Sequence, residues 1–295
     1  MVVCIPELPG AVVTWAREHG LGRVLHATTL TGGCSNRVRR LHFAHGATCV
    51  LKTPGATAAR ADPAYAAEAD GLRLLITPQG PLLPTLQRCA AEFLLLSDLG
   101  GASPRPGFWR ELGQGLARIH ARQQPAFGMP LDEVSDAPLR ARGWMYGLEA
   151  DGWSFFTERQ LLPLARLALG AQPQLHSAVE RLALQVRQLI PAQPPVVLHG
   201  DLWHGNVHSG PYGEPAVLDP AAHGGWAEMD LAMTRLFGGF PAEFYQAYEA
   251  LHPPLPGLSG RLALYQLPAL LNHLRLFGDG YLPQVAAHLA RYVPV

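Results

Sequence analysis

The stretch from residue 196 to residue 219 restricts the possible folds more than any other. It opens with an apolar run that predicts a buried strand, and Asp201 and Asn206 follow at the spacing Asp-x4-Asn. Two more short strands lead to a second acidic residue, Asp219. In phosphoryl transfer, one Asp orients a hydroxyl nucleophile, while an Asn and another Asp hold magnesium on a nucleotide phosphate. The strands are predicted at 196–198, 207–208 and 216–218.

Two other interpretations of this stretch are open. Asp and Asn beside Gly are common turn residues, and one of them alone indicates a turn more often than a ligand. His199, Asp201, His204 and His208 could instead form a metal cluster, since His and Asp are frequent metal ligands. Their spacing matches no zinc motif, so we favour the kinase-type loop over a metallohydrolase.

Composition limits the class of protein. The chain has 295 residues, 48% of them hydrophobic, which is enough for one large domain or two lobes with a sizeable core. The 23 basic and 23 acidic residues cancel, which argues against nucleic-acid and anionic-membrane partners. No signal pattern and no apolar run of membrane-spanning length occurs, so a cytoplasmic protein is expected. The cysteines lack zinc-ligand spacing and are expected to be reduced: Cys4, Cys34, Cys49 and Cys89.

Lys52 is the only lysine, so arginine supplies the other 22 of the 23 basic residues (23 − 1). Arginine would serve a surface charge equally well, which suggests a chemical role for this ammonium. A compact ammonium reaches between phosphates where a planar guanidinium does not fit the same slot.

The residues around Lys52 support this role. A turn containing Gly32, Gly33 and Asn36 joins two predicted strands and can lay backbone N–H groups over phosphates. Lys52 lies on the next strand but one, where a kinase carries its phosphate-binding lysine. Glu68 lies on the apolar face of a helix that begins near residue 63, and such a Glu needs a cation, for which Lys52 is the candidate. A helix is predicted at 10–19, and strands at 24–30, 38–43 and 48–53.

A strand at 92–97 runs into a Gly-rich link, which predicts a hinge between two lobes. The adenine of a nucleotide would pair with the backbone from Ser97 to Leu99. We expect a nucleotide-binding lobe over 1–99 and a helical lobe with the catalytic loop and acceptor site over 100–295. Helices are predicted at 107–121, 153–169, 174–190, 228–236, 241–251, 257–277 and 281–293.

With these motifs the chain resembles the fructosamine (ketosamine) kinase family, within the aminoglycoside phosphotransferase and protein-kinase-like group. The resemblance covers nearly the whole chain, and HGDLWxGN with a downstream LFGGF is its most specific part. The resemblance implies an α+β, two-lobed protein-kinase-like fold with a small antiparallel-sheet N-lobe and a mainly helical C-lobe. It is carried by the segments 31–36 (TGGCSN), 153–159 (WSFFTER), 199–206 (HGDLWHGN), 219–221 (DPA), 228–233 (EMDLAM), 236–240 (LFGGF), 264–267 (LYQL) and 271–273 (LNH).

The resemblance implies phosphorylation of a ketosamine sugar hydroxyl that depends on ATP and Mg2+ and serves protein deglycation. It makes Asp201 the catalytic residue and Asn206 and Asp219 the magnesium ligands. Lys52 would contact the phosphates and Glu68 would hold Lys52. The acceptor would be a small-molecule ketosamine or a glycated protein.

Three further residues carry hypotheses of their own. Trp203 would face the sugar, although a core role is an equally good interpretation. Asp230 would brace the catalytic loop from the following helix. Cys34, in the glycine turn, is a candidate redox-sensitive thiol or a small residue chosen for fit, so a monomer or a redox-linked homodimer is expected.

The sequence departs from the family pattern just after Asp219, with Gly224, Trp226 and Ala227 in a segment expected near the acceptor. Substrate choice is therefore less defined than phosphotransfer. A kinase for an aminoglycoside or choline is the alternative, but the acceptor-side helices show no acidic bias: Arg159, Arg261 and Arg275. A regulatory pseudokinase should lack Asp201, Asn206, Asp219 or Lys52, and all are present.

Overall fold

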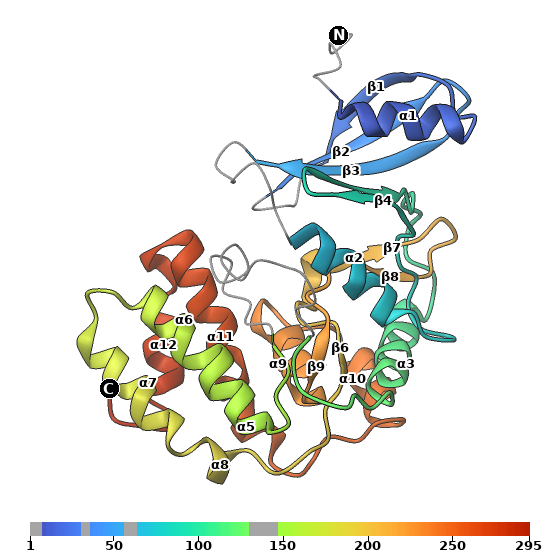
Figure 1. Ribbon diagram of the computed structural model, residues 1–295. Coiled ribbons are helices and arrows are strands. Elements are labelled where there is room, and N and C mark those ends of the chain that lie inside the picture. The colour runs from blue at the N-terminus through green and yellow to red at the C-terminus, as the bar shows by residue number, and fades with distance from the viewer. Residues whose placement is uncertain (1–7, 31–35, 56–63, 130–146) are drawn as a thin grey trace.

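The structure is a computed structural model that describes residues 8–30, 36–55, 64–129 and 147–295. Its N-terminal part is an antiparallel sheet with the strand order β1-β2-β3-β5-β4. In Figure 1 this sheet lies above the helical remainder of the chain. The strands are β1 (Val24–Thr29), β2 (Asn36–Phe43), β3 (Thr48–Pro54), β4 (Leu86–Ala90) and β5 (Phe93–Ser97).

The two faces of the sheet have different roles, because side chains alternate along each strand. One face is apolar: Leu41 of β2 and Leu51 of β3 are buried under Trp15 of helix α1 (Gly10–Glu18). The other face carries Lys52, the next residue of β3, which lies opposite Val38 in the register of β2 and β3. The alternation therefore directs Lys52 away from α1 and towards helix α2 (Ala64–Leu75) and the rest of the molecule.

Helix α2 lies between the sheet and the helical part (Figure 1) and contacts β4, β5 and β6. Arg122 fixes its C-terminal end, because its Nη1 donates to the carbonyls of Leu74 at 2.6 Å and Ile76 at 3.1 Å. A cation on the last carbonyls of a helix satisfies groups that the helix itself cannot pair. The position of Glu68 on α2 is thereby tied to the helical part of the chain.

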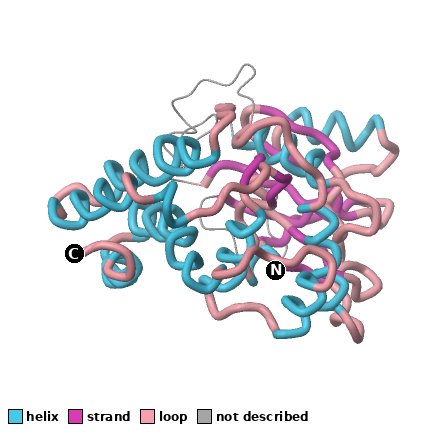
Figure 2. The backbone as a smooth tube through the Cα atoms, turned by 90° about the horizontal axis from the view of Figure 1, so that it is seen from below, coloured by secondary structure: helices cyan, strands magenta, loops and turns pink. Residues whose placement is uncertain are grey.

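The helical part packs around one large apolar core between α6, α7, α11 and α12, with a second core between α3 and α10. Figure 2 shows the strands gathered at one end of the molecule, with helices around them and further helices at the other end. The helices are α3 (Phe108–His120), α5 (Gly152–Ser154), α6 (Leu162–Ala168), α7 (Pro173–Ala183), α8 (Val186–Leu189), α9 (Ala227–Leu236), α10 (Ala242–Glu249), α11 (Leu258–Phe277) and α12 (Leu282–Leu289).

Two short antiparallel strand pairs lie in the stretch that contains Asp201, Asn206 and Asp219. Strand β6 (Val196–Leu198) pairs with β9 (His223–Gly225), and β7 (Val207–Ser209) pairs with β8 (Pro215–Val217). All three residues of β6 are buried, as the apolar run predicted. The α+β fold class, with a small antiparallel sheet and a mainly helical remainder, is confirmed.

Five details differ from the sequence-based expectation. Strand β4 was missed because LQRCA is polar and only half-buried, and β9 was missed because His-Gly-Gly has no strand propensity and pairs only through its contact with β6. The helix expected over 153–169 contains a π-helical segment, Phe155–Leu161. The helix expected over 174–190 ends at Ala183 and resumes at Val186 as α8. The helix expected over 281–293 begins at Leu282, after a 3₁₀ turn at Asp279–Tyr281, and already ends at Leu289.

Candidate active site

Lys52 joins the two parts of the molecule through a buried ion-pair cluster. Its Nζ lies 2.5 Å from Glu68 Oε1 of α2 and 2.5 Å from Asp219 Oδ1, which follows β8. Burial disfavours the ammonium, but the two carboxylates outweigh burial and raise the pKa of Lys52, which therefore stays charged. The predicted pairing of Lys52 with Glu68 is confirmed, and the contact with Asp219 was not foreseen.

Asp219 is the open member of this cluster. Its side chain is 44% exposed, against 4% for Lys52, and no hydrogen bond of a described residue reaches its Oδ2. Its backbone is left-handed with φ +52°, which is uncommon for any residue other than Gly. Strained backbone of this kind is found preferentially at functional sites, so a role for Asp219 beyond its ion pair is indicated.

Asp201 and Asn206 are held together directly after β6. The Nδ2 of Asn206 donates to Asp201 Oδ2 at 2.9 Å and to the Asp201 carbonyl at 2.7 Å. The carbonyl of Asn206 accepts from Leu218 N at 2.9 Å, which places Asn206 beside the strand that ends at Asp219. Because the amide nitrogen is committed, Asn206 Oδ1 is the atom left for another ligand within the described residues.

Burial raises the pKa of Asp201 to about 8, with smaller contributions from Asp219 and Asp230, and the hydrogen bond from Asn206 opposes the shift. A carboxyl group with a pKa near neutral pH is suited to take a proton from a hydroxyl, because its two protonation states are then close in free energy.

Asp230 of α9 braces the loop that carries Asp201. Its Oδ2 accepts from His199 N at 2.7 Å and its Oδ1 accepts from Gly200 N at 2.8 Å, as the sequence predicted. Gly200 has φ +81°, and a Cβ there would meet the Ala221 carbonyl oxygen at 2.1 Å. Only glycine can therefore bring this backbone under the carboxylate.

A second layer that sequence reasoning missed holds Asp230. His120, at the end of α3 and fully buried, donates from Nε2 to Asp230 Oδ2 at 3.1 Å. Its Nδ1 accepts from the Tyr248 hydroxyl of α10 at 2.7 Å. Burial opposes ionisation of Asp230, but the hydrogen bonds from His120 and from the Gly200 backbone outweigh it and lower the pKa of Asp230. The signal was present in the sequence, since His120 continues the apolar face of Leu112, Leu116 and Ile119 and so needs a buried partner.

The predicted hinge runs from β5 to α3. Ser97 N donates to the Thr85 carbonyl at 2.8 Å, so this amide is committed within the sheet. Asp98 pairs with Arg40 of β2 at 2.6 Å and accepts from Gly100 N at 3.1 Å. The carbonyl of Ser97 and the backbone of Leu99 remain as candidates for adenine, with Asp98 fixed between them.

The other predicted site residues have varied positions. Asn36 begins β2, and its Oδ1 accepts from the Tyr65 hydroxyl of α2 at 3.2 Å. Trp203 is half-buried and contacts Phe237, so it is not a core residue. Gly32, Gly33 and Cys34 lie outside the described residues.

The alternative interpretation as a metal cluster is wrong. The described residues contain no group of three or more His, Cys, Asp or Glu side chains placed to hold a metal, so the four-residue cluster does not form. His204 instead donates to the Gly239 carbonyl at 2.7 Å, His208 donates to the Gly100 carbonyl at 3.0 Å, and burial keeps His199 neutral by lowering its pKa.

The segment after Asp219, which was expected near the acceptor, is buried from residue 222 to residue 228. Gly224 lies in β9, where a Cβ would meet the Ala126 carbonyl oxygen at 2.3 Å, and Trp226 and Ala227 are buried. Arg261, expected on the acceptor side, is buried in a bidentate pair with Glu228 at 2.6 and 2.8 Å. These departures from the family pattern therefore belong to packing rather than to substrate contact.

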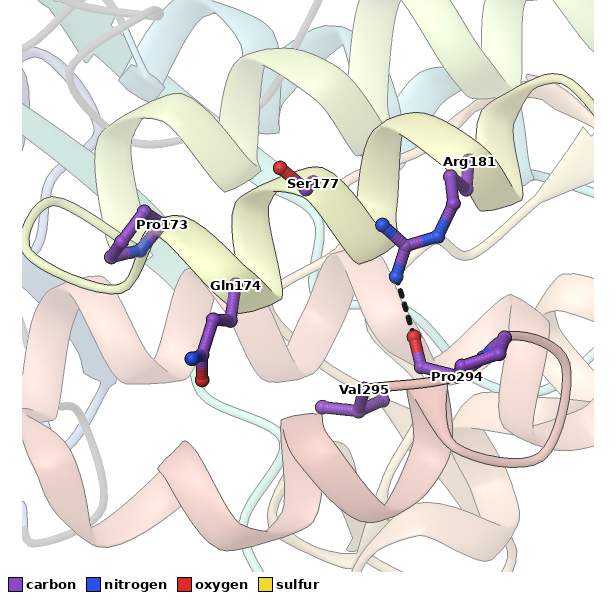
Figure 3. Close-up of a pocket in the computed structure, with 6 residues that line it drawn as sticks. All are labelled: Pro173, Gln174, Ser177, Arg181, Pro294 and Val295. Atoms are coloured by element: carbon purple, nitrogen blue, oxygen red, sulfur yellow. Dashed lines mark hydrogen bonds between the residues drawn. The ribbon is translucent and has the colours of Figure 1, made fainter.

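A shallow pocket lies elsewhere, between α7 and the end of the chain (Figure 3). Arg181 donates to the Pro294 carbonyl across it at 2.5 Å. It shares no residue with the Lys52 and Asp201 clusters. Its lining is Pro173, Gln174, Ser177, Arg181, Pro294 and Val295.

A family model described as fructosamine kinase matches residues 12–294. A "probable ketoamine kinase" of Synechocystis sp. is 38% identical over 75% of this chain and 75% of its own length. A second protein of that name, from Thermus thermophilus, is 37% identical over 90% of this chain and 94% of its own length.

The fold is also shared with solved structures. The crystal structure of a candidate fructosamine-3-kinase from Thermobifida fusca has a TM-score of 0.80 at 27% identity, covering 96% of this chain and 99% of that chain. An aminoglycoside phosphotransferase has a TM-score of 0.59 at 16% identity, covering 96% and 97%. The expected protein-kinase-like, two-lobed fold is therefore confirmed. None of the helices in the described ranges combines the length and the apolar character needed to span a bilayer.

Proposed function

The chain belongs to the fructosamine kinase family, whose members are phosphotransferases with an alcohol acceptor, and we propose that it transfers the γ-phosphoryl group of ATP to a sugar hydroxyl of a ketosamine. One observation carries this proposal: Lys52, the only lysine, is buried between Glu68 of α2 and Asp219, which follows β8. This is the arrangement in which a kinase lysine is held for the phosphates of its nucleotide.

The nucleotide would lie in the lobe formed by residues 1–99, against the hinge from Ser97 to Leu99. Adenine would pair with free backbone groups there, and the turn with Gly32 and Gly33 would cover the phosphates together with Asn36. Lys52 would meet the phosphates, since Glu68 fixes its ammonium from α2. The lobe formed by residues 100–295 would supply the catalytic loop and the acceptor site.

The residues beside the phosphate site fit a magnesium ion. Asn206 Oδ1 and the exposed carboxylate of Asp219 are oxygen donors, which magnesium prefers, and both have an atom free of other described partners. Magnesium bound there would neutralise charge on the transferring phosphoryl group. A pair of protein ligands is sufficient for magnesium, because phosphates and waters complete its shell.

Asp201 would act as the base for the acceptor. It would orient the sugar hydroxyl and accept its proton as the oxygen attacks the γ-phosphorus and ADP leaves. Asp230, by holding His199 N and Gly200 N, would keep this carboxylate in place. Trp203 is half-buried beside the base, and its indole face would suit the apolar side of a sugar ring.

The phosphorylated adduct of a ketosamine decomposes, so the proposed role is deglycation of amines or proteins in the cytoplasm. The protein would act as a monomer, or as a homodimer linked through Cys34. No nucleic-acid or membrane partner is proposed, in keeping with the balanced charge of the chain.

The test is a coupled assay of ADP release with ATP and magnesium, using fructosyl-lysine and ribulosyl-lysine as acceptors and lysine as the control. We expect release that depends on the ketosamine. An aminoglycoside and choline are included as competing acceptors. Turnover with either of those, and none with the ketosamines, would replace the proposed substrate class.

A further inference from the structure

Aromatic rings continue outward from the catalytic loop. Trp203 contacts Phe237 with ring centroids 5.6 Å apart, and Phe237 contacts His273 at 4.9 Å. His273 in turn contacts Phe277 at 5.3 Å and Tyr281 at 5.2 Å. We call these residues the aromatic row. It begins two residues after Asp201 and ends at Phe277, the last residue of α11, and at Tyr281 in the 3₁₀ turn that follows.

The aromatic row lies outside the fully buried core, although Tyr281 packs against the large apolar core. Phe277 is 47% exposed, and Trp203, Phe237, His273 and Tyr281 are all half-buried. Exposing a row of aromatic rings to water costs free energy. A ligand that covers the rings would remove this cost. The row starts on the same loop as Asp201, because Trp203 follows Asp201 by two residues.

The inner half of the row is held rigidly. Phe237 ends α9, and the turn that follows it is tied to the catalytic loop by the hydrogen bond from His204 Nε2 to the Gly239 carbonyl at 2.7 Å. His273 donates from Nδ1 to the Ala269 carbonyl at 2.8 Å, which fixes its ring on α11. Helix α11 packs on α9 (Figure 1), and this packing fixes the distance between the rings of Phe237 and His273.

Charge near the outer half is balanced. Between residues 271 and 282 the charged side chains are Arg275 and Asp279. A polycationic acceptor would need an acidic cluster, which this segment does not offer. Ring faces instead suit apolar or aromatic groups, and they also attract a protonated amine.

We propose that the aromatic row binds the amine carrier of the acceptor and selects ketosamines whose carrier is apolar or aromatic. This inference rests on the proposed function, since it places the sugar at Asp201 and Trp203. The protonated secondary amine would lie near Phe237, and the carrier would extend over His273 towards Phe277 and Tyr281. Selectivity would arise at the outer rings, which are remote from the base.

The experiment compares two acceptors that share sugar and amine: the fructose adducts of phenylethylamine and of ethylamine. For the wild type we expect KM to be about tenfold lower for the phenylethyl adduct. In Phe277→Ala and Tyr281→Ala we expect that KM to rise about fivefold, with kcat, the KM for ATP and the KM for the ethyl adduct unchanged. Tyr212→Ala is the matched control, because Tyr212 is an 81% exposed aromatic residue of the β7–β8 turn.

Equal KM values for the two adducts in the wild type would overturn the inference, as would a rise in both KM values in the Phe277 variant. Calorimetric titration of the two adducts separates this failure from failure of the proposed function. Absence of turnover with both adducts would sink the proposed function. Preferential binding of the phenylethyl adduct, lost in Phe277→Ala, would still support the aromatic row, and binding without preference would refute it.

Discussion

Two buried polar clusters lie beside the loop that carries Asp201, and they differ in whether every carboxylate oxygen has a hydrogen-bond partner. In the cluster of Asp230, both oxygens accept hydrogen bonds, from His199 N, Gly200 N and His120. In the cluster of Lys52, the carboxylate of Asp219 is 44% exposed and keeps one oxygen free of described partners. A closed cluster holds structure, whereas an open one can take a ligand, since buried polar atoms otherwise find partners within the protein.

Asp201 lies between the two clusters, and its removal should have the largest effect. For Asp201→Asn we expect kcat to fall by about 10³-fold, because the amide cannot accept the hydroxyl proton. ATP binding should persist, since the Lys52 cluster remains intact. Single-turnover kinetics and nucleotide titration measure the two quantities. A loss of ATP affinity as large as the loss of rate would contradict the role of Asp201 as a base.

Asp230→Asn tests the closed cluster. The variant keeps the shape but removes the charge that His120 and two backbone amides satisfy, so we expect the free energy of unfolding to fall by about 3 kcal/mol at pH 7.

The pH dependence of the Asp230 effect has a fixed sign. The pKa of Asp230 is lowered in the folded protein, so its contribution is present above the ordinary Asp pKa and is lost as the pH falls through the lowered value. Urea unfolding at pH 7 and at pH 3 should therefore show a smaller difference between wild type and variant at the acidic pH. A constant difference would show that the charge is not the source.

Lys52→Arg tests the open cluster. The planar guanidinium should displace Glu68 and misplace the phosphates, so we expect kcat/KM to fall by about 100-fold, or ~2.7 kcal/mol. Arg39→Lys is a control for exchange of a buried base, because Arg39 is 5% exposed on the opposite face of the sheet. Near-normal kcat/KM in the Lys52 variant would contradict the inference that the only lysine has a chemical role.

Asn206 Oδ1 and Asp219 Oδ2 have no other partner among the described residues, which predicts that they influence the magnesium requirement. Asn206→Ala removes one oxygen donor, and we expect the magnesium concentration at half-maximal rate to rise about tenfold. Asn206→Asp restores an oxygen ligand and should recover part of the loss. Saturation of Asn206→Ala at the wild-type magnesium concentration would show that the residue holds only Asp201.

The contrast between these two clusters also explains which site residues could be predicted from the sequence. The positions of Asp201, Asn206, Asp219, Lys52 and Glu68 were predictable, because motif spacing and a single unusual lysine report on chemistry that few residue types perform. Local patterns also gave most helices and strands.

What the sequence did not reveal depends on contacts between distant segments. Strand β9 forms only because β6 pairs with it, and the partners His120 and Tyr248 are far from Asp230 in the chain. Gly224 and Trp226 follow Asp219 closely in the sequence, yet β9 and the residue after it are buried in the core. Distance along the chain from a motif therefore did not indicate distance from the site.

The smallest expected effect concerns Tyr248, which is connected to Asp230 through His120. Tyr248→Phe removes the hydroxyl that donates to His120 Nδ1 at 2.7 Å and keeps the buried ring. We expect the free energy of unfolding to fall by about 1 kcal/mol, the usual contribution of one neutral hydrogen bond. Because His120 can still donate to Asp230, kcat should change less than twofold and the KM for ATP should not change. Tyr245→Phe is the matched control: Tyr245 is also on α10, but its hydroxyl contacts Thr234 and Phe240 N rather than His120. A large fall in kcat in Tyr248→Phe alone would show that the hydroxyl positions the catalytic loop through His120 and Asp230.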